Sequence, residues 1–139
     1  MKEKYLLYAE DDIDDQEVLK DTMAAIDDEI NIVCVHNGQE LFTYLDTLKE
    51  GMLYPCCIIL DLNMPVMNGF ETLKLLKQRP EYAPIPVIIF STSSAEEDRR
   101  RAMKNGAASF ITKPVQQNHI EKACREFATY CHTVSQHPV

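Results

Sequence analysis

The amino-acid sequence predicts an α/β domain in which five parallel strands form one open sheet with helices on both faces. The chain has 139 residues, which suits a single domain. Five short apolar runs are continuous rather than alternating, as expected for strands buried on both faces of a parallel sheet. Segments with helical spacing lie between these runs, and this alternation indicates a doubly wound (βα)5 arrangement.

The predicted strands are residues 5–9, 32–35, 56–60, 87–90 and 110–111. Apolar stripes at helical spacing predict helices over residues 18–26, 41–48, 70–76 and 120–131. A further helix around residues 95–104 has only Ala95, Ala102 and Met103 as apolar positions. We therefore expect this fourth helix to be the least buried of the five.

Several residues predict where these helices begin and end. Gly51 and Gly106 follow the second and fourth helices, where a left-handed residue often ends a helix. Ser94 and Glu97 have the spacing of a capping box at the start of the fourth helix. Asp12 is equally well read as the N-cap of the first helix or as part of an acidic site.

The net charge of −8 belongs to one end of the chain. Residues 1–29 contain eleven acids and three bases, whereas the remaining residues are electrically balanced. An acidic chain without a basic stripe is a poor candidate for nucleic-acid binding, which depends on phosphate neutralisation. Apolar runs are too short to cross a bilayer, so we expect no membrane association.

The cysteines are odd in number and contain no CxxC pair. Cys56 and Cys57 lie within an apolar run, where they resemble small buried hydrophobic residues. We therefore expect free thiols and a cytoplasmic location.

The candidate site lies where the predicted strands end. The flavodoxin-like strand order 2-1-3-4-5 brings the carboxyl ends of strands one, three, four and five together, where ligands of such sheets bind. These ends carry acids, hydroxyls and a lysine: Glu10, Asp11, Asp12, Asp61, Ser91, Thr92 and Lys113.

Clustered carboxylates repel one another unless a cation compensates them, and Mg²⁺ prefers carboxylate oxygens. Asp11 and Asp61 suit direct binding of Mg²⁺, with Glu10 or Asp12 acting through water. Lys113 could hold a phosphoryl oxygen, and Ser91, with Thr92 as the alternative, offers a hydroxyl to the same group. We interpret Asp14, Asp15 and Glu17 as a solvated face at the helix N-terminus, which the helix dipole favours.

Four segments resemble the receiver domains of two-component response regulators. They are LLYAEDD at residues 6–12, DLNMPVMNG at 61–69, PVIIFST at 86–92 and GAASFITKP at 106–114. The resemblance covers about residues 4–130. It implies a receiver domain over residues 1–131, a short tail over 132–139 and no output domain.

The resemblance also implies roles for individual residues. Asp61 would be the phosphoacceptor, with Mg²⁺ bound by Glu10, Asp11, Asp61 and the main-chain carbonyl of Asn63. Lys113 and Ser91 would contact the phosphoryl group, Ser91 and Phe110 would form the switch, and Asp12 and Thr92 are secondary candidates. The bond between Lys113 and Pro114 would be cis, which costs less before proline than elsewhere.

As a receiver, the chain would take its phosphoryl group from a sensor histidine kinase or a histidine phosphotransfer protein. It would signal to a protein partner through the face formed by the fourth helix, fifth strand and fifth helix. The segment at residues 92–98 is similar to stand-alone receivers associated with hybrid or phytochrome-type kinases. We expect no enzymatic activity beyond the chain's own phosphorylation and dephosphorylation.

Two alternatives remain open. A pseudo-receiver would keep the fold without phosphorylation, although such a protein would be expected to lose Asp61, Asp11 or Lys113. A small Mg²⁺-dependent phosphatase of the haloacid-dehalogenase type is suggested only by Asp12 and Asp14, and the chain is short for that fold.

Overall fold

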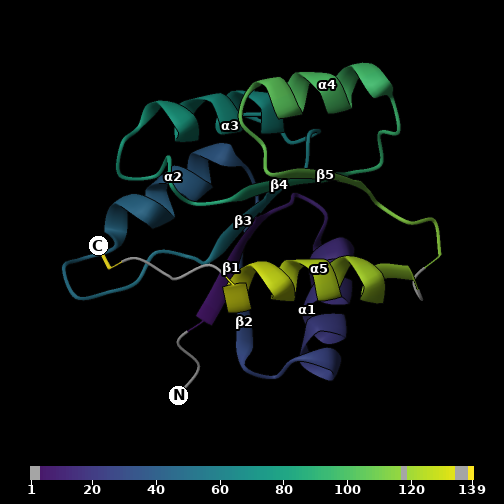
Figure 1. Ribbon diagram of the computed structural model, residues 1–139, viewed down its shortest axis with the longest axis horizontal. Helices are drawn as coiled ribbons and strands as arrows, with labels where there is room; N and C mark the ends of the chain where they lie inside the picture. Colours follow the sequence, from purple (N-terminus) through teal and green to yellow (C-terminus); the bar gives the residue numbers. More distant parts are fainter. Residues whose placement is uncertain (1–3, 117–118, 134–137) are drawn as a thin grey trace.

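Five parallel strands form one sheet in the order β2-β1-β3-β4-β5, which confirms the predicted topology (Figure 1). The computed structural model describes residues 4–116, 119–133 and 138–139. The elements alternate along the chain: β1 (Lys4–Ala9), α1 (Ile13–Ile26), β2 (Ile30–Val35), α2 (Gly38–Thr47), β3 (Cys57–Leu60), α3 (Gly69–Gln78), β4 (Val87–Ser91), α4 (Glu96–Lys104), β5 (Ser109–Thr112) and α5 (Ile120–Thr133).

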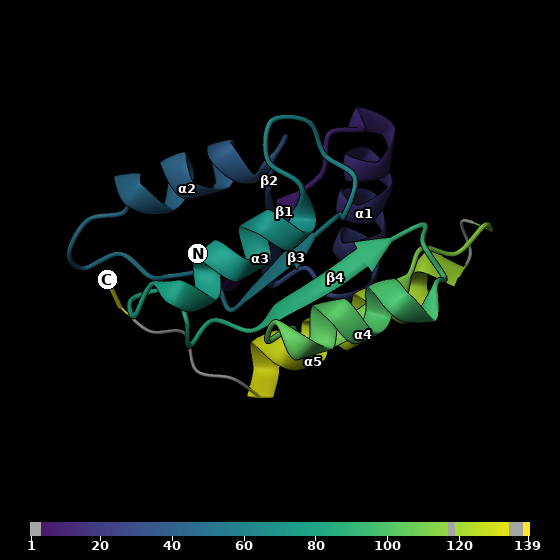
Figure 2. The ribbon, with the colours of Figure 1, turned by 90° about the horizontal axis from the view of Figure 1, so that it is seen from above.

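Helices cover both faces of the sheet. Helices α2, α3 and α4 lie on one face, and α1 and α5 lie on the other (Figures 1 and 2). Successive strand residues point to opposite faces, so Leu7 and Ala9 join the core beneath α2–α4, while Leu6 and Tyr8 join the core beneath α1 and α5. Because both faces are covered, β1, β3 and β4 need apolar residues at consecutive positions, as the sequence predicted.

Polar side chains cap the N-termini of α1, α2 and α3, where the N-caps are Asp12, Asn37 and Asn68. Asp12 accepts a hydrogen bond from the Asp15 N–H and is the N-cap of α1. Asn68 and Glu71 form a full capping box at the start of α3.

The capping box predicted for Ser94 and Glu97 is wrong. The N-cap of α4 is Ala95, which makes no side-chain capping bond. Ser93 is used instead: its hydroxyl accepts from the Ala95 N–H and donates to Asp98. The Thr112 hydroxyl donates to the Ser93 carbonyl. This tertiary contact with β5 holds the loop so that Ser93, one residue before Ser94, makes the contacts at the start of α4.

Of the two glycines predicted to end helices, Gly106 does so and Gly51 does not. Gly106 follows the C-cap Asn105 of α4 with a φ of 99°, as predicted. Gly51 also has a positive φ, but α2 ends with Leu48 as its C-cap. Gly51 therefore serves the turn that the Met52 N–H closes onto the Lys49 carbonyl, not the end of the helix.

Helix α4 is the least buried helix, as predicted, because Ala102 is its single buried residue. No helix within the described ranges has both the length and the apolar character needed to cross a membrane.

The prediction that all cysteines are free is wrong. Cys56, just before β3, forms a disulfide with Cys131 near the end of α5, and their Cα atoms are 5.1 Å apart. The two residues are separated by 75 positions, so only the packing of α5 against the sheet brings them together. Cys34, Cys57 and Cys124 remain free, as predicted.

Candidate functional site

Two buried acids stand side by side at the carboxyl edge of the sheet. Glu10 directly follows β1, and its N–H donates to the Val35 carbonyl. Asp61 directly follows β3, and its N–H donates to the Ala9 carbonyl at 3.2 Å. These hydrogen bonds extend the sheet by one residue and fix both acids at neighbouring strand ends.

The acids form a candidate metal site. Glu10, Asp11 and Asp61 each offer a carboxylate oxygen, and these oxygens lie within 4.8 Å of one another. Such a set of hard oxygen donors fits Mg²⁺ or Mn²⁺ better than a soft metal. The Asn63 N–H donates to Asp61 Oδ1 at 3.2 Å, which orients the carboxylate. The main-chain carbonyl of Asn63 stays a predicted metal ligand. A metal-binding role for Asp12, whose carboxylate caps α1, also stays a prediction.

Lys113 brings a positive charge into the same place. Its Nζ lies 3.0 Å from Asp61 Oδ2 and 2.9 Å from Asp15 Oδ2, and it also contacts Glu10 Oε1. The Lys113 N–H donates to the Ser91 carbonyl at 2.7 Å, so pairing with β4 sets its position. Burial lowers the pKa of Lys113, but the hydrogen bonds that it donates to Glu10 and Asp15 and the charge of Asp61 outweigh this effect and keep the pKa above its usual value.

Glu10 is the most buried acid of the cluster, with only 1% of its surface exposed. Its carboxylate accepts hydrogen bonds from the Tyr8 hydroxyl and the Asp12 N–H, both at 3.3 Å. Burial raises the pKa of Glu10 to about 8, although the bond with Lys113 opposes this rise. A carboxylate in this position therefore depends on nearby cations for its charge.

Asp15 belongs to the site, which the sequence interpretation missed. From the sequence we interpreted Asp15 as one of the solvated acids. In the structure its carboxylate contacts the Lys113 ammonium from the first turn of α1. One feature of the sequence could have indicated a role for Asp15: it lies at the start of a helix, and helix starts face the strand ends in this fold. Nothing in the sequence distinguished Asp15 from Asp14, which is exposed.

The two predicted switch residues lie inside the protein. Ser91 is fully buried at the end of β4, and Phe110 in β5 packs into the core beneath α2–α4. Thr92, the alternative hydroxyl, is exposed.

The prediction of a cis peptide bond before Pro114 is wrong, because the described chain contains no cis peptide bond. A trans bond is the intrinsically preferred isomer by about 0.5–1 kcal/mol, and the turn after β5 accommodates it. Lys113 reaches the acids with this trans bond in place.

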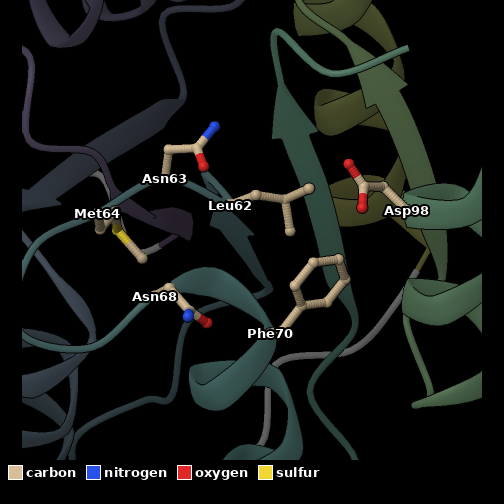
Figure 3. Close-up of a pocket in the computed structure, with 6 residues that line it drawn as sticks. All are labelled: Leu62, Asn63, Met64, Asn68, Phe70 and Asp98. Atoms are coloured by element: carbon tan, nitrogen blue, oxygen red, sulfur yellow. The ribbon is translucent and has the colours of Figure 1, made fainter. Parts of the chain in front are cut away.

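A pocket of about 440 Å³ opens beside the acids. The loop after β3 and the start of α3 line one side with Asn63, Met64 and Asn68, and Asp98 of α4 faces them across Leu62 and Phe70 (Figure 3). The pocket separates the loop after Asp61 from α4.

The family model described as "Response regulator receiver domain" matches residues 6–125. The chain belongs to this family. The match spans most of the described chain, so the fold and family expected from the four motifs are confirmed.

Two curated relatives are identical to this receiver domain at about a third of the aligned residues. The probable methanogenesis regulatory protein FilR2 of Methanothrix harundinacea is 31% identical over 69% of this chain and 63% of its own length. The two-component response regulator ORR1 of Oryza sativa is 31% identical over 73% of this chain. The receiver domain spans only 45% of the length of ORR1.

Solved structures agree with the fold. The phosphorylated cyanobacterial phytochrome response regulator RcpA is 26% identical, with a TM-score of 0.84, covering 96% of this chain and 97% of its own. The Mn²⁺-bound response regulator Rcp1 is 24% identical, with a TM-score of 0.82, covering 95% and 97%. The likeness to Rcp1 shows a shared fold.

Three exposed apolar residues follow strand ends in this receiver domain. Ile13 begins α1, Val66 lies in the loop after β3, and Val115 follows β5. They are 61%, 80% and 102% exposed, respectively. The sequence interpretation did not single them out, because exposure cannot be read from residue type.

Proposed function

We propose that this receiver domain is a phosphoacceptor signalling protein that receives a phosphoryl group on Asp61 from a phosphohistidine donor. The observation that carries the proposal is the position of the Asp61 carboxylate. It lies 3.0 Å from the Lys113 ammonium and within 4.8 Å of the Glu10 and Asp11 oxygens. A donor of this kind is held by a sensor histidine kinase or a histidine phosphotransfer protein.

The transfer exchanges one bond to phosphorus for another. A carboxylate oxygen of Asp61 forms a bond to phosphorus as the phosphorus–nitrogen bond of the donor breaks, and the electron pair stays on the imidazole nitrogen. Charge spreads over the phosphoryl oxygens during this step, so positioning and charge neutralisation supply most of the catalysis. Lys113 donates an N–H to one of these oxygens.

Mg²⁺ is the proposed cofactor. Glu10, Asp11, Asp61 and the Asn63 carbonyl would hold it, with Asp12 as a secondary candidate. The bound cation would neutralise charge on the carboxylates and on the phosphoryl oxygens. The Mn²⁺ of Rcp1 supports a divalent cation of this kind, because that protein has the same fold.

The signal would pass through Ser91 and Phe110. Phosphorylation adds roughly −1.5 to −2 charge, and a buried Ser91 hydroxyl can turn to donate to the new oxygens. Movement of Ser91 would open space for Phe110, which changes the surface formed by α4, β5 and α5. A protein partner on that surface would read the change.

A docking partner would meet exposed apolar side chains after three of the strands. Ile13, Val66 and Val115 offer exposed apolar side chains in the segments that follow β1, β3 and β5. Contact of this kind would exclude water from the transfer.

Labelling with acetyl phosphate and Mg²⁺ tests the proposal. Wild type should gain one phosphoryl group by intact mass, and Asp61→Asn should gain none while keeping its circular dichroism spectrum. Asp14→Asn, which removes an exposed acid, should label normally. Normal labelling of Asp61→Asn would sink the assignment.

The same experiment separates the alternatives. A pseudo-receiver predicts no labelling of wild type, and a phosphatase predicts multiple turnover of a small phosphoester. Lys113→Ala should still accept the phosphoryl group but lose the gain in partner affinity. Retained affinity would count against Lys113 as a switch contact.

A further inference from the structure

Lys113 has no free donor in this structure. An ammonium group carries three N–H donors. Glu10 Oε1, Asp15 Oδ2 and Asp61 Oδ2 each accept from it. A phosphoryl oxygen on Asp61 can therefore gain an N–H from Lys113 only when one of these three carboxylates gives it up.

The three carboxylates differ in the free-energy cost of losing the contact with Lys113. The side chain of Glu10 is 1% exposed and that of Asp61 is 10% exposed, whereas that of Asp15 is 45% exposed. A buried carboxylate that loses its cation stays unsolvated, which is strongly unfavourable. The Asp15 carboxylate can turn to water, so of the three contacts its own costs least to break.

Asp15 also stands apart from the metal candidates. The set of oxygens that could hold a cation contains Glu10, Asp11 and Asp61, but not Asp15. A cation held by Glu10, Asp11 and Asp61 would therefore leave the contact between Asp15 and Lys113 in place. Asp15 lies in the first turn of α1 and not at a strand end.

We propose that Asp15 is a positioning residue that holds the third N–H of Lys113 until a phosphoryl group on Asp61 replaces it. The inference rests on the proposed function, because it needs a phosphoryl group at Asp61. Asp15 then acts in two ways. It keeps the ammonium at the mouth of the site, and it competes with the incoming anion, so it limits phosphorylation at low donor concentration.

Titration with beryllofluoride in the presence of Mg²⁺ measures this competition without a donor protein. Half-saturation of Asp15→Asn, followed by ¹⁹F NMR, should occur at about two- to five-fold lower beryllofluoride than in wild type, the range expected for an ion pair whose acid can be solvated. Asp14→Asn is the matched control, since it removes the same charge from the same helical turn. Asp15→Glu should restore most of the wild-type value, and thermal midpoints should stay close for all variants.

A second measurement does not depend on phosphorylation. Acetylation of the Lys113 amine in metal-free protein, followed by mass spectrometry, should be faster in Asp15→Asn than in Asp14→Asn, because one of its three anchors is gone. Equal Lys113 labelling in both variants would overturn the proposal, as would equal beryllofluoride half-saturation. If wild type binds no beryllofluoride, the proposed function fails and the competition fails with it. Faster Lys113 labelling would then show that the Asp15 contact itself is real.

Discussion

Arg99 of α4 donates a hydrogen bond from its Nη1 atom to the main-chain oxygen of Phe110 in β5, at 3.3 Å. Since α4 buries only Ala102, contacts of this kind do much to hold the helix on the sheet. Arg101 adds a second contact, with its guanidinium 4.0 Å from the centre of the Phe70 ring on α3. Helix α4, which contacts Phe110 of the proposed switch, is therefore attached by a few polar contacts and little apolar area.

Loss of the Arg99 contact should loosen α4. Arg99→Ala should lower the free energy of unfolding by about 0.5–1.5 kcal/mol, the usual worth of one hydrogen bond. It should also speed amide hydrogen exchange in α4 more than in α1. Arg100→Ala, an exposed neighbour on the same helix, is the control and should change neither. Equal exchange in the two variants would show that the Phe110 contact does not hold α4.

Val66 carries backbone strain. Its φ is 66°, a left-handed value that is rare for a β-branched residue, and the Met67 N–H closes the turn onto the Pro65 carbonyl at 2.7 Å. Val66→Gly removes strain of about 1–2 kcal/mol, against about 0.5–1 kcal/mol of added backbone entropy. Urea unfolding should therefore show a net gain of about 0.5–1 kcal/mol. Val115→Gly, at another exposed valine without this strain, should lose stability, and a loss in both variants would refute the argument.

The contact between Asp27 and His132 should make stability depend on acid pH. His132 Nε2 lies 2.6 Å from Asp27 Oδ2 and joins the ends of α1 and α5. The hydrogen bond from His132 lowers the pKa of Asp27 below its ordinary 3.8. A lowered folded-state pKa stabilises the protein above pH 3.8, and this contribution disappears as the pH falls through the folded-state value.

An NMR titration of Asp27 checks this direction. His132→Ala should raise the pKa of Asp27 toward 3.8 and weaken the loss of stability at acid pH. His36→Ala removes a different histidine, paired with Glu40, and should leave Asp27 unchanged. An Asp27 pKa that does not respond to His132→Ala would contradict the assignment.

The bond between Cys56 and Cys131 predicts a thiol count. Without reductant, alkylation of the denatured chain should modify three cysteines, and after reduction it should modify all five. Reduction should lower the free energy of unfolding by about 2–4 kcal/mol, the usual effect of losing a disulfide. Cys131→Ser should abolish the response to reductant, whereas Cys124→Ser, at a free buried cysteine on the same helix, should keep it. Five modified thiols before reduction would mean that the pair is open.

The strands and the location of the site could be predicted because they depend on the local pattern of apolar and polar residues. Continuous apolar runs identified all five strands to within two residues at either end. Chain order placed Glu10 and Asp61 at strand ends, and parallel pairing then put them together. The Lys113 contact with Asp61 followed from the same argument, since β5 ends at that edge as well.

The remaining features depend on contacts between distant segments. The third carboxylate on Lys113, the disulfide between Cys56 and Cys131, and the use of Ser93 instead of Ser94 each needed a partner far away in the chain. The trans bond before Pro114 belongs with them, because the isomer depends on how the following turn is accommodated.

The sequence by itself determined the order of elements, the apolar faces and the edge where the acids gather. Tertiary structure decided which of the two acids in the first turn of α1, Asp14 or Asp15, reaches Lys113. Hydrophobic periodicity is repeated over many residues, so its errors average out along a strand or helix. A single side-chain contact depends on the relative placement of two elements to within an ångström, and no local pattern carries that information.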